Sequence, residues 1–312
     1  FGGEAQPTDY ARAIADGALL ALIACLGLAQ LGHETTPALA QLFFIANLFY
    51  GVAALPYQRI GARIALAVGL FGLALSGAPT VGIVLAIGAA VLVALDRHRA
   101  LADPSDEEPR YRATASLEIV GIALLALVVV LALGLWRWQI ALPGQDGRPL
   151  SADLRSQAKL LLWFTWPAWP LALWTLWRWR RQLTARHVML PLWFALVPLA
   201  ATWTTDFSDR SLLLALPAFA TLAAFALPTF RRSAAALVDW FTLLFFSGAA
   251  FIIWGYWIAM QTGVPPKMAA SITRLVPGFA PTFSWLNFGF AIAATLAWGW
   301  LVRWRTGRHR AA

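Results

Sequence analysis

Charged residues and cysteine are both scarce in this chain. Only 12% of its 312 residues are charged, whereas 60% are hydrophobic, and the mean hydropathy is +0.66. A soluble domain carries about 25% charged residues, so this composition excludes an ordinary soluble protein. The single cysteine, Cys25, lies in an apolar run, which excludes a disulfide framework and a cysteine metal site. We expect Cys25 to be a small buried hydrophobe.

Several catalytic motifs are also missing. The sequence contains no glycine-rich phosphate loop, no His-x-x-x-His pair and no Gly-x-Ser-x-Gly. It does contain an excess of basic residues, with 24 Lys and Arg against 15 Asp and Glu, a net charge of +9. The basic residues cluster in short loops between apolar runs, as the positive-inside rule expects of membrane proteins. We therefore expect membrane lipids, and not nucleic acid, as partners.

Long apolar runs define the fold class. Residues 115–135 contain one charge, Glu118, and are long enough to cross a hydrocarbon core of about 30 Å as a helix. The runs are continuous, unlike the alternating segments of about ten residues in a membrane barrel. We expect an all-α, polytopic transmembrane bundle of about nine or ten spans, forming a single transmembrane domain over residues 1–312. Since the sequence starts at Phe1 without methionine, we also expect it to be a portion of a longer chain.

The order of spans and loops gives the expected topology. The expected spans are 11–31, 38–55, 64–95 in two helices, 116–138, 160–177 with a kink at Pro167 and Pro170, 188–203, 211–227, 240–260 and 284–302. The break near Ser76-Gly77-Ala78-Pro79 is expected to form either a hairpin or a broken helix. Arg-rich loops at 178–186, 229–232 and 303–310 belong in the cytoplasm, together with the polar loop 96–115. The loops 32–37, 139–157, 204–210 and 261–282 are then extracytoplasmic.

Ionisable residues at the outer ends of spans are the candidates for a functional site. They are His33, Glu34, Asp206, Asp209, Arg210, Lys267 and Arg274. The carboxylates Glu34, Asp206 and Asp209 are expected to act as general bases or to hold a divalent cation, the one cofactor that we consider. The cations Arg210, Lys267 and Arg274 are expected to bind phosphate. The alternative for each residue is a charge that meets only water and headgroups.

Three motifs resemble one enzyme superfamily. Arg210-Ser-Leu-Leu-Leu-Ala-Leu-Pro217 resembles an Arg-Tyr-x-x-Pro-x-x-Pro helix start, with Ser211 and Leu214 departing from it. Leu75-Ser-Gly-Ala-Pro79 resembles a Leu-(Ser/Thr)-Lys-Gly-Pro break without its lysine, and Glu34-Thr-Thr-Pro37 resembles an outer-loop acid before a span. These patterns are similar to the membrane portion of the GT-C glycosyltransferases, the aminoarabinose-transferase-like and protein-mannosyltransferase-like enzymes.

The resemblance implies a bacterial inner-membrane, multi-pass enzyme. It would transfer a sugar from a polyprenyl-phosphate donor to a lipid A-like or protein acceptor on the extracytoplasmic face. The superfamily's first outer loop carries an Asp-Glu-x-Arg-Tyr motif that is not found at an equivalent place here. We therefore expect either that this N-terminal catalytic loop is missing from the sequence or that the protein is a divergent member. The alternatives are a lipid-linked sugar transporter or flippase, which needs polar residues through the depth of the bundle, and a non-catalytic scaffold subunit. The oligomeric state is left open.

Overall fold

The computed structural model describes residues 6–58, 60–102, 114–136, 150–204, 209–230 and 232–308. Within these ranges every regular element is a helix, which confirms the all-α class. The chain forms two compact units, Phe1–Ala235 and Ala236–Ala312, and each is described here by itself.

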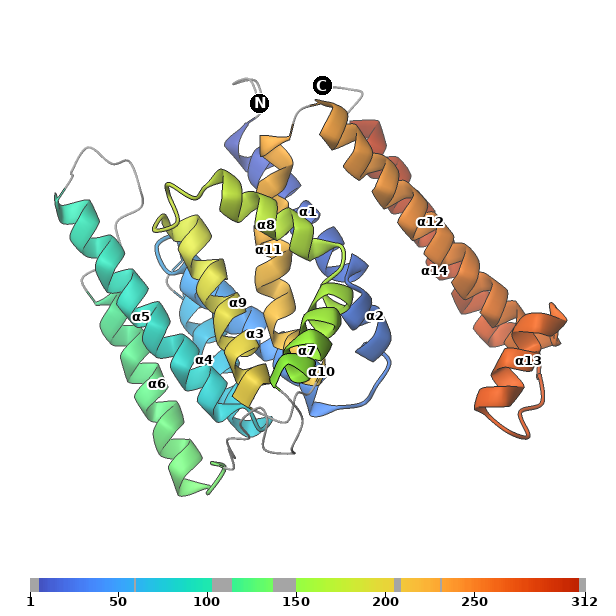
Figure 1. The fold of residues 1–312 in the computed structure, drawn as a ribbon, viewed down its shortest axis with the longest axis horizontal. Helices are drawn as coiled ribbons and strands as arrows, with labels where there is room; N and C mark the ends of the chain where they lie inside the picture. The colour runs from blue at the N-terminus through green and yellow to red at the C-terminus, as the bar shows by residue number, and fades with distance from the viewer. Residues whose placement is uncertain are drawn as a thin grey trace. The chain divides into compact units, whose positions relative to one another are not determined.

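Among the described residues of the larger unit there are eleven α-helices and two short 3-10 helices, and Figure 1 shows their arrangement. They are α1 (Pro7–Ala24), α2 (Leu26–Leu31), α3 (Pro37–Ala54), α4 (Ile60–Leu75), α5 (Pro79–Ala102), α6 (Ala115–Ala132), α7 (Leu150–Phe164), α8 (Ala168–Arg178), α9 (Arg186–Thr204), α10 (Asp209–Leu212), η1 (Leu213–Ala215), α11 (Leu216–Ala226) and η2 (Leu227–Thr229). The smaller unit contains most of α12 (Arg232–Thr262), then α13 (Pro266–Leu275) and α14 (Trp285–Arg308).

In the part of the chain that the structure describes, five segments are long and apolar enough to cross a membrane, and together with the composition they indicate a membrane protein. They are Pro37–Ala54, Pro79–Asp96, Ala115–Ala132, Arg210–Thr229 and Leu244–Thr262. Two shorter apolar helices, Ile60–Leu75 and Arg186–Thr202, also occur among the described residues. The expected number of about nine or ten spans is not confirmed by this criterion of length and composition.

The expected break near Ser76 and Pro79 is a tight hairpin. The N–H of Ala78 donates to the carbonyl of Leu73 at 2.9 Å, and Gly77 has φ +95°. This is the Schellman ending of a helix, in which glycine takes the left-handed position. Pro79 then begins α5, and Gly82 faces Leu73 across the hairpin.

Glycines allow α3 and α4 to pack closely. A Cβ atom at Gly69 would come within 2.7 Å of the Cβ of Leu48, and one at Gly72 would overlap the ring of Phe44. Membrane helices use small residues in this way, because close backbone approach gains van der Waals contact where no hydrophobic effect acts between helices. Leu48, Leu66, Leu70 and Leu73 are almost completely buried, so this contact forms part of the core.

Two of the expected spans are interrupted helices whose breaks meet. The span expected at 11–31 divides at Cys25, which has an extended backbone (φ −62°, ψ 124°) between α1 and α2. The span at 160–177 divides at residues 165–167, between α7 and α8, where the sequence predicted only a kink. The N–H of Leu26 donates to the carbonyl of Trp166 at 3.0 Å, and the ring of Phe164 packs on Gly27. Each break thus supplies a polar partner to the other, as backbone inside a membrane bundle requires.

The smaller unit is a hairpin of α12 and α14. The indole of Trp254 donates to the hydroxyl of Thr295 at 3.2 Å, and the rings of Trp257 and Phe288 stack with centroids 6.0 Å apart. The stretch 261–282, expected as a loop, contains helix α13. Its half-buried Met268 approaches Gly255 of α12, which is a tertiary contact that the proline-rich sequence did not reveal.

Candidate functional site

Two of the candidate residues form an ion pair. A guanidinium nitrogen of Arg210 lies 3.2 Å from a carboxylate oxygen of Glu34, across 176 residues of sequence. The Arg210 side chain is 54% exposed and that of Glu34 is 31% exposed. The pair therefore lies at the boundary between the bundle and its surroundings, and Arg210 makes this contact through one of its guanidinium nitrogens.

Short turns hold Glu34 at this position. The N–H of Glu34 donates to the carbonyl of Leu31 at the end of α2, and the N–H of Thr36 donates to the carbonyl of Glu34, both at 3.0 Å. Pro37 then begins α3, one residue before the expected span 38–55. Glu34 is thus carried on a compact connection between two helices.

A hydroxyl chain fixes the start of α10, which carries Arg210. Ser211 lies 3.0 Å, hydroxyl to hydroxyl, from Thr202 of α9, and Thr202 in turn donates to the carbonyl of Pro198 at 2.8 Å. Thr202 is only 3% exposed, so this link is internal. It ties the first residues of α10 to the end of α9 and limits where Arg210 can reach.

A third connection lies at the same end of the unit. Gln41, in the second turn of α3, donates its side-chain amide to the carbonyl of Ser76 at 2.8 Å. The α4–α5 hairpin therefore contacts the start of α3, next to the Glu34 turn. Figure 1 shows the α2–α3 turn, the α4–α5 turn and α10 at one end of the larger unit.

Of the other candidates, the structure describes the side chains of His33, Lys267 and Arg274. Asp206 lies outside the described residues. Asp209 is the first residue of α10, but its side chain lies outside the described part. His33 is exposed beside Glu34. Lys267 and Arg274 are exposed on α13, seven residues apart and so on one face of that helix, in the smaller unit.

A metal site finds no support among the described side chains. Within them, no group of three or more His, Cys, Asp or Glu lies close enough to hold a metal ion. The described buried polar side chains are Thr165, Thr175 and Thr202, and each donates to a backbone carbonyl. Those hydroxyls serve the helices and do not form a polar path through the bundle.

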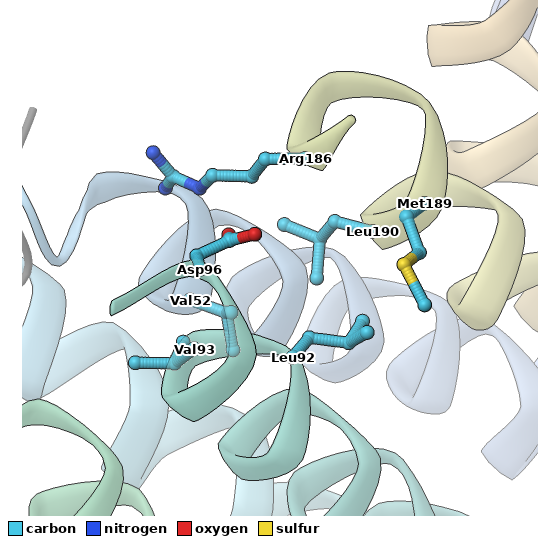
Figure 2. Close-up of a pocket in the computed structure, with 7 residues that line it drawn as sticks. All are labelled: Val52, Leu92, Val93, Asp96, Arg186, Met189 and Leu190. Atoms are coloured by element: carbon cyan, nitrogen blue, oxygen red, sulfur yellow. The ribbon is translucent and has the colours of Figure 1, made fainter. Parts of the chain in front are cut away.

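A small cavity marks the opposite end of the larger unit, near the start of α9 (Figure 2). Asp96 of α5 and Arg186 of α9 lie at its polar side, while Val52, Val93 and Leu190 are among the apolar residues around it. The space is about 10 Å³, which fits about one water molecule and excludes a sugar or lipid headgroup.

The role of Arg186 at this cavity was not evident from the sequence. Its guanidinium donates to the carbonyl of Ala53 at 2.6 Å, in the last turn of α3, and lies 5.9 Å from the ring centroid of Tyr57. A cation near a helix C-terminus satisfies a free carbonyl and complements the helix dipole. In the sequence, Arg186 is one of several arginines in the stretch 178–186, and this pattern does not show which of them makes a tertiary contact.

No family model matches this chain, and no curated protein or solved structure matches it.

Proposed function

We propose that this chain is the membrane core of a bacterial inner-membrane GT-C glycosyltransferase. It transfers a sugar from a polyprenyl-phosphate donor to a lipid A-like or protein acceptor on the extracytoplasmic face. The observation that carries the proposal is the contact between Glu34 and Arg210, an acid and a cation from two remote connections. The motif resemblances at Glu34, Pro79 and Arg210 support it, because all three stretches lie at one end of the larger unit.

The topology of the proposal is multi-pass. Each interrupted helix counts as one crossing, so that α1 with α2, α7 with α8, and α10 with η1 and α11 contribute one each. With α3, α4, α5, α6, α9, α12 and α14, the proposed total is ten. The contact of Arg186 with Ala53 supports the assignment of loops to sides, because it joins the last residue of the Arg-rich loop 178–186 to the last turn of α3, the end of that helix opposite to Glu34.

The proposed chemistry uses the two charges differently. Arg210 binds the donor phosphate through its other N–H groups and stabilises the charge that develops as the bond between sugar C1 and the phosphate oxygen breaks. The acceptor hydroxyl forms the new bond to C1 and gives its proton to a carboxylate, for which we assign Glu34. The phosphate leaves with the electron pair of the broken bond.

The ion pair has a further part in this scheme. Before the donor arrives, Glu34 holds Arg210 through a single contact of 3.2 Å at a half-exposed position. An exposed ion pair of this kind contributes between about 0 and 1 kcal/mol, so the singly charged phosphodiester of the donor can compete for the guanidinium at little cost. Glu34 would then be released toward the acceptor.

The structure favours this proposal over the two rivals. A scaffold subunit predicts outer charges that point apart into solvent, whereas Glu34 and Arg210 are in contact. A flippase needs polar groups through the bundle, whereas the described buried polar residues are three threonines bonded to backbone. Both observations favour a site at the rim of the bundle.

The test is sugar transfer from a polyprenyl-phosphate donor by the full-length protein in lipid nanodiscs. We expect Arg210→Gln to lower turnover by about 100-fold, the cost of losing one oxyanion-stabilising donor. Glu34→Gln should lower it by about 100-fold or more, as expected for loss of a general base.

The matched control is the ion pair between Arg63 and Glu118, whose nitrogen and oxygen lie 2.8 Å apart. It joins α4 to α6 through two hydrogen bonds and has no assigned role in transfer. Arg63→Gln should leave turnover near the wild-type value. Equal losses in Arg63→Gln and Arg210→Gln, or unchanged turnover in both Arg210→Gln and Glu34→Gln, would contradict the site assignment.

A further inference from the structure

A basic groove lies on the larger unit beyond the C-terminal end of α8. It is lined by Arg178, Trp179, Arg180, Arg181, Gln182 and Thr229, and its volume is about 470 Å³. That volume falls in the range of about 300–1,000 Å³ in which small-molecule sites occur. None of these residues belongs to the Glu34–Arg210 pair.

The lining is rich in hydrogen-bond donors and positive charge. The three arginines are exposed, and within the described residues no carboxylate pairs with any of them. Arg180 is held in place, because it donates to the carbonyl of Trp177 at 3.0 Å and lies 5.1 Å from that ring's centroid. A guanidinium held in this way retains other N–H groups that can bind an anion.

Trp179 contributes an independent sign of a ligand. Its indole nitrogen is buried, yet it has no hydrogen-bond acceptor among the described residues. The ring is fixed by an edge contact with His187, with centroids 4.7 Å apart. Buried indole N–H groups usually have an acceptor. Because Trp179 also lines the cationic groove, we take an anionic oxygen as the missing partner of this N–H.

The surroundings of the groove are typical of a membrane interface. Trp174 and Trp177 are 39% and 57% exposed, and the indole of Trp174 donates to the hydroxyl of Thr229 at 2.9 Å. Tryptophans gather at headgroup level, and basic pockets between membrane helices bind anionic headgroups.

We propose that this groove binds a phosphate group, with Arg180 and Arg181 providing charge and the indole N–H of Trp179 providing a directed hydrogen bond. The ligand class is a phosphomonoester or phosphodiester, carried by an anionic phospholipid or free in solution. The site is separate from the proposed transfer site and does not depend on the proposed function.

The experiment measures phosphate binding to the whole chain in detergent, with two probes. Native mass spectrometry reports retention of phosphatidic acid against phosphatidylcholine, and ³¹P NMR line broadening reports binding of inorganic phosphate. We expect Arg180→Gln/Arg181→Gln to reduce binding about tenfold or more, since the variant loses both positive charges that attract the anion. Retention of phosphatidic acid without broadening of inorganic phosphate identifies a lipid headgroup, and broadening without lipid retention identifies a soluble phosphate.

Two further variants separate a built site from general electrostatic attraction. Arg12→Gln/Arg155→Gln removes the same charge from exposed positions outside the groove and should leave binding unchanged. Trp179→Phe keeps the ring but removes the N–H, and should weaken binding severalfold with no change in charge. The proposal is overturned if neither probe binds, if both arginine pairs reduce binding equally, or if Trp179→Phe binds as the wild type does.

Discussion

The N–H of Leu26 donates to the carbonyl of Trp166 at 3.0 Å, and this bond joins the breaks of two interrupted helices. Cys25 ends α1, and residues 165–167 separate α7 from α8, so both segments have backbone groups without helical partners. Such groups are costly in an apolar bundle unless they are satisfied inside the protein. The crossing of the two breaks therefore explains how each is tolerated.

The crossing predicts that Gly27 cannot be replaced without cost. A Cβ atom at this position would overlap the buried ring of Phe164. Gly27→Ala should lower the free energy of unfolding by about 1–3 kcal/mol, the usual cost of overpacking. Thermal unfolding in one detergent checks this.

The control for that substitution is Gly121→Ala in α6. No atom lies within 4 Å of a Cβ placed at Gly121, and alanine is favoured over glycine inside a helix by about 0.5–1 kcal/mol. This variant should be as stable as the wild type or slightly more stable. If both substitutions have the same effect, the close contact at Gly27 does not control stability.

The Glu34–Arg210 pair should contribute little to stability. Because Arg210 is 54% exposed, solvent screens the pair, and a double-mutant cycle of Glu34→Gln and Arg210→Gln should give a coupling free energy below about 1 kcal/mol. Chemical unfolding of the four proteins measures it. A coupling of several kcal/mol would mean that the pair is structural, and lost transfer in the variants would then reflect misfolding.

Arg186 should matter more for folding than its neighbours in the arginine-rich stretch. Its hydrogen bond to the carbonyl of Ala53 joins α9 to the end of α3. Arg186→Gln should lower the free energy of unfolding by about 1.5–3 kcal/mol, typical of a hydrogen bond with a charged donor. Arg155→Gln, an exposed change of the same type, should have almost no effect on the melting temperature.

The proposed topology predicts which residues a membrane-impermeant maleimide can reach in whole cells. A cysteine at Arg274 should react without permeabilisation, because residues 261–282 are assigned to the outer face. A cysteine at Arg181 should react only after the membrane is opened. Cys25 is fully buried, so the native chain should show no background labelling. Labelling of both positions from the same side would contradict the assignment.

Local features of the sequence predicted several helix boundaries. The break before Pro79 was expected, and α5 begins at Pro79, while α3 begins at Pro37, one residue before the expected span 38–55. Proline fits the first turn of a helix and cannot continue a preceding one. The break at Cys25 was missed, since the residues around it carry no proline signal and the extended backbone depends on a partner 140 residues away. Helix α13 was missed because Gly263, Pro265 and Pro266 indicated a loop, whereas Met268 packs near Gly255.

By itself, the sequence determined that this is an apolar, all-helical chain with basic and mixed connections, because composition and run length act locally on each segment. Only the tertiary structure decided that Leu26 meets Trp166 and that Glu34 meets Arg210. These contacts depend on which helices become neighbours. Many helices have similar apolar surfaces, so the sequence of one segment does not show which other helix it will contact. Glycines such as Gly27 and Gly69 help to select the neighbouring helix, because they allow two helices to approach closely. This role can be recognised only when the residue that faces the glycine is known.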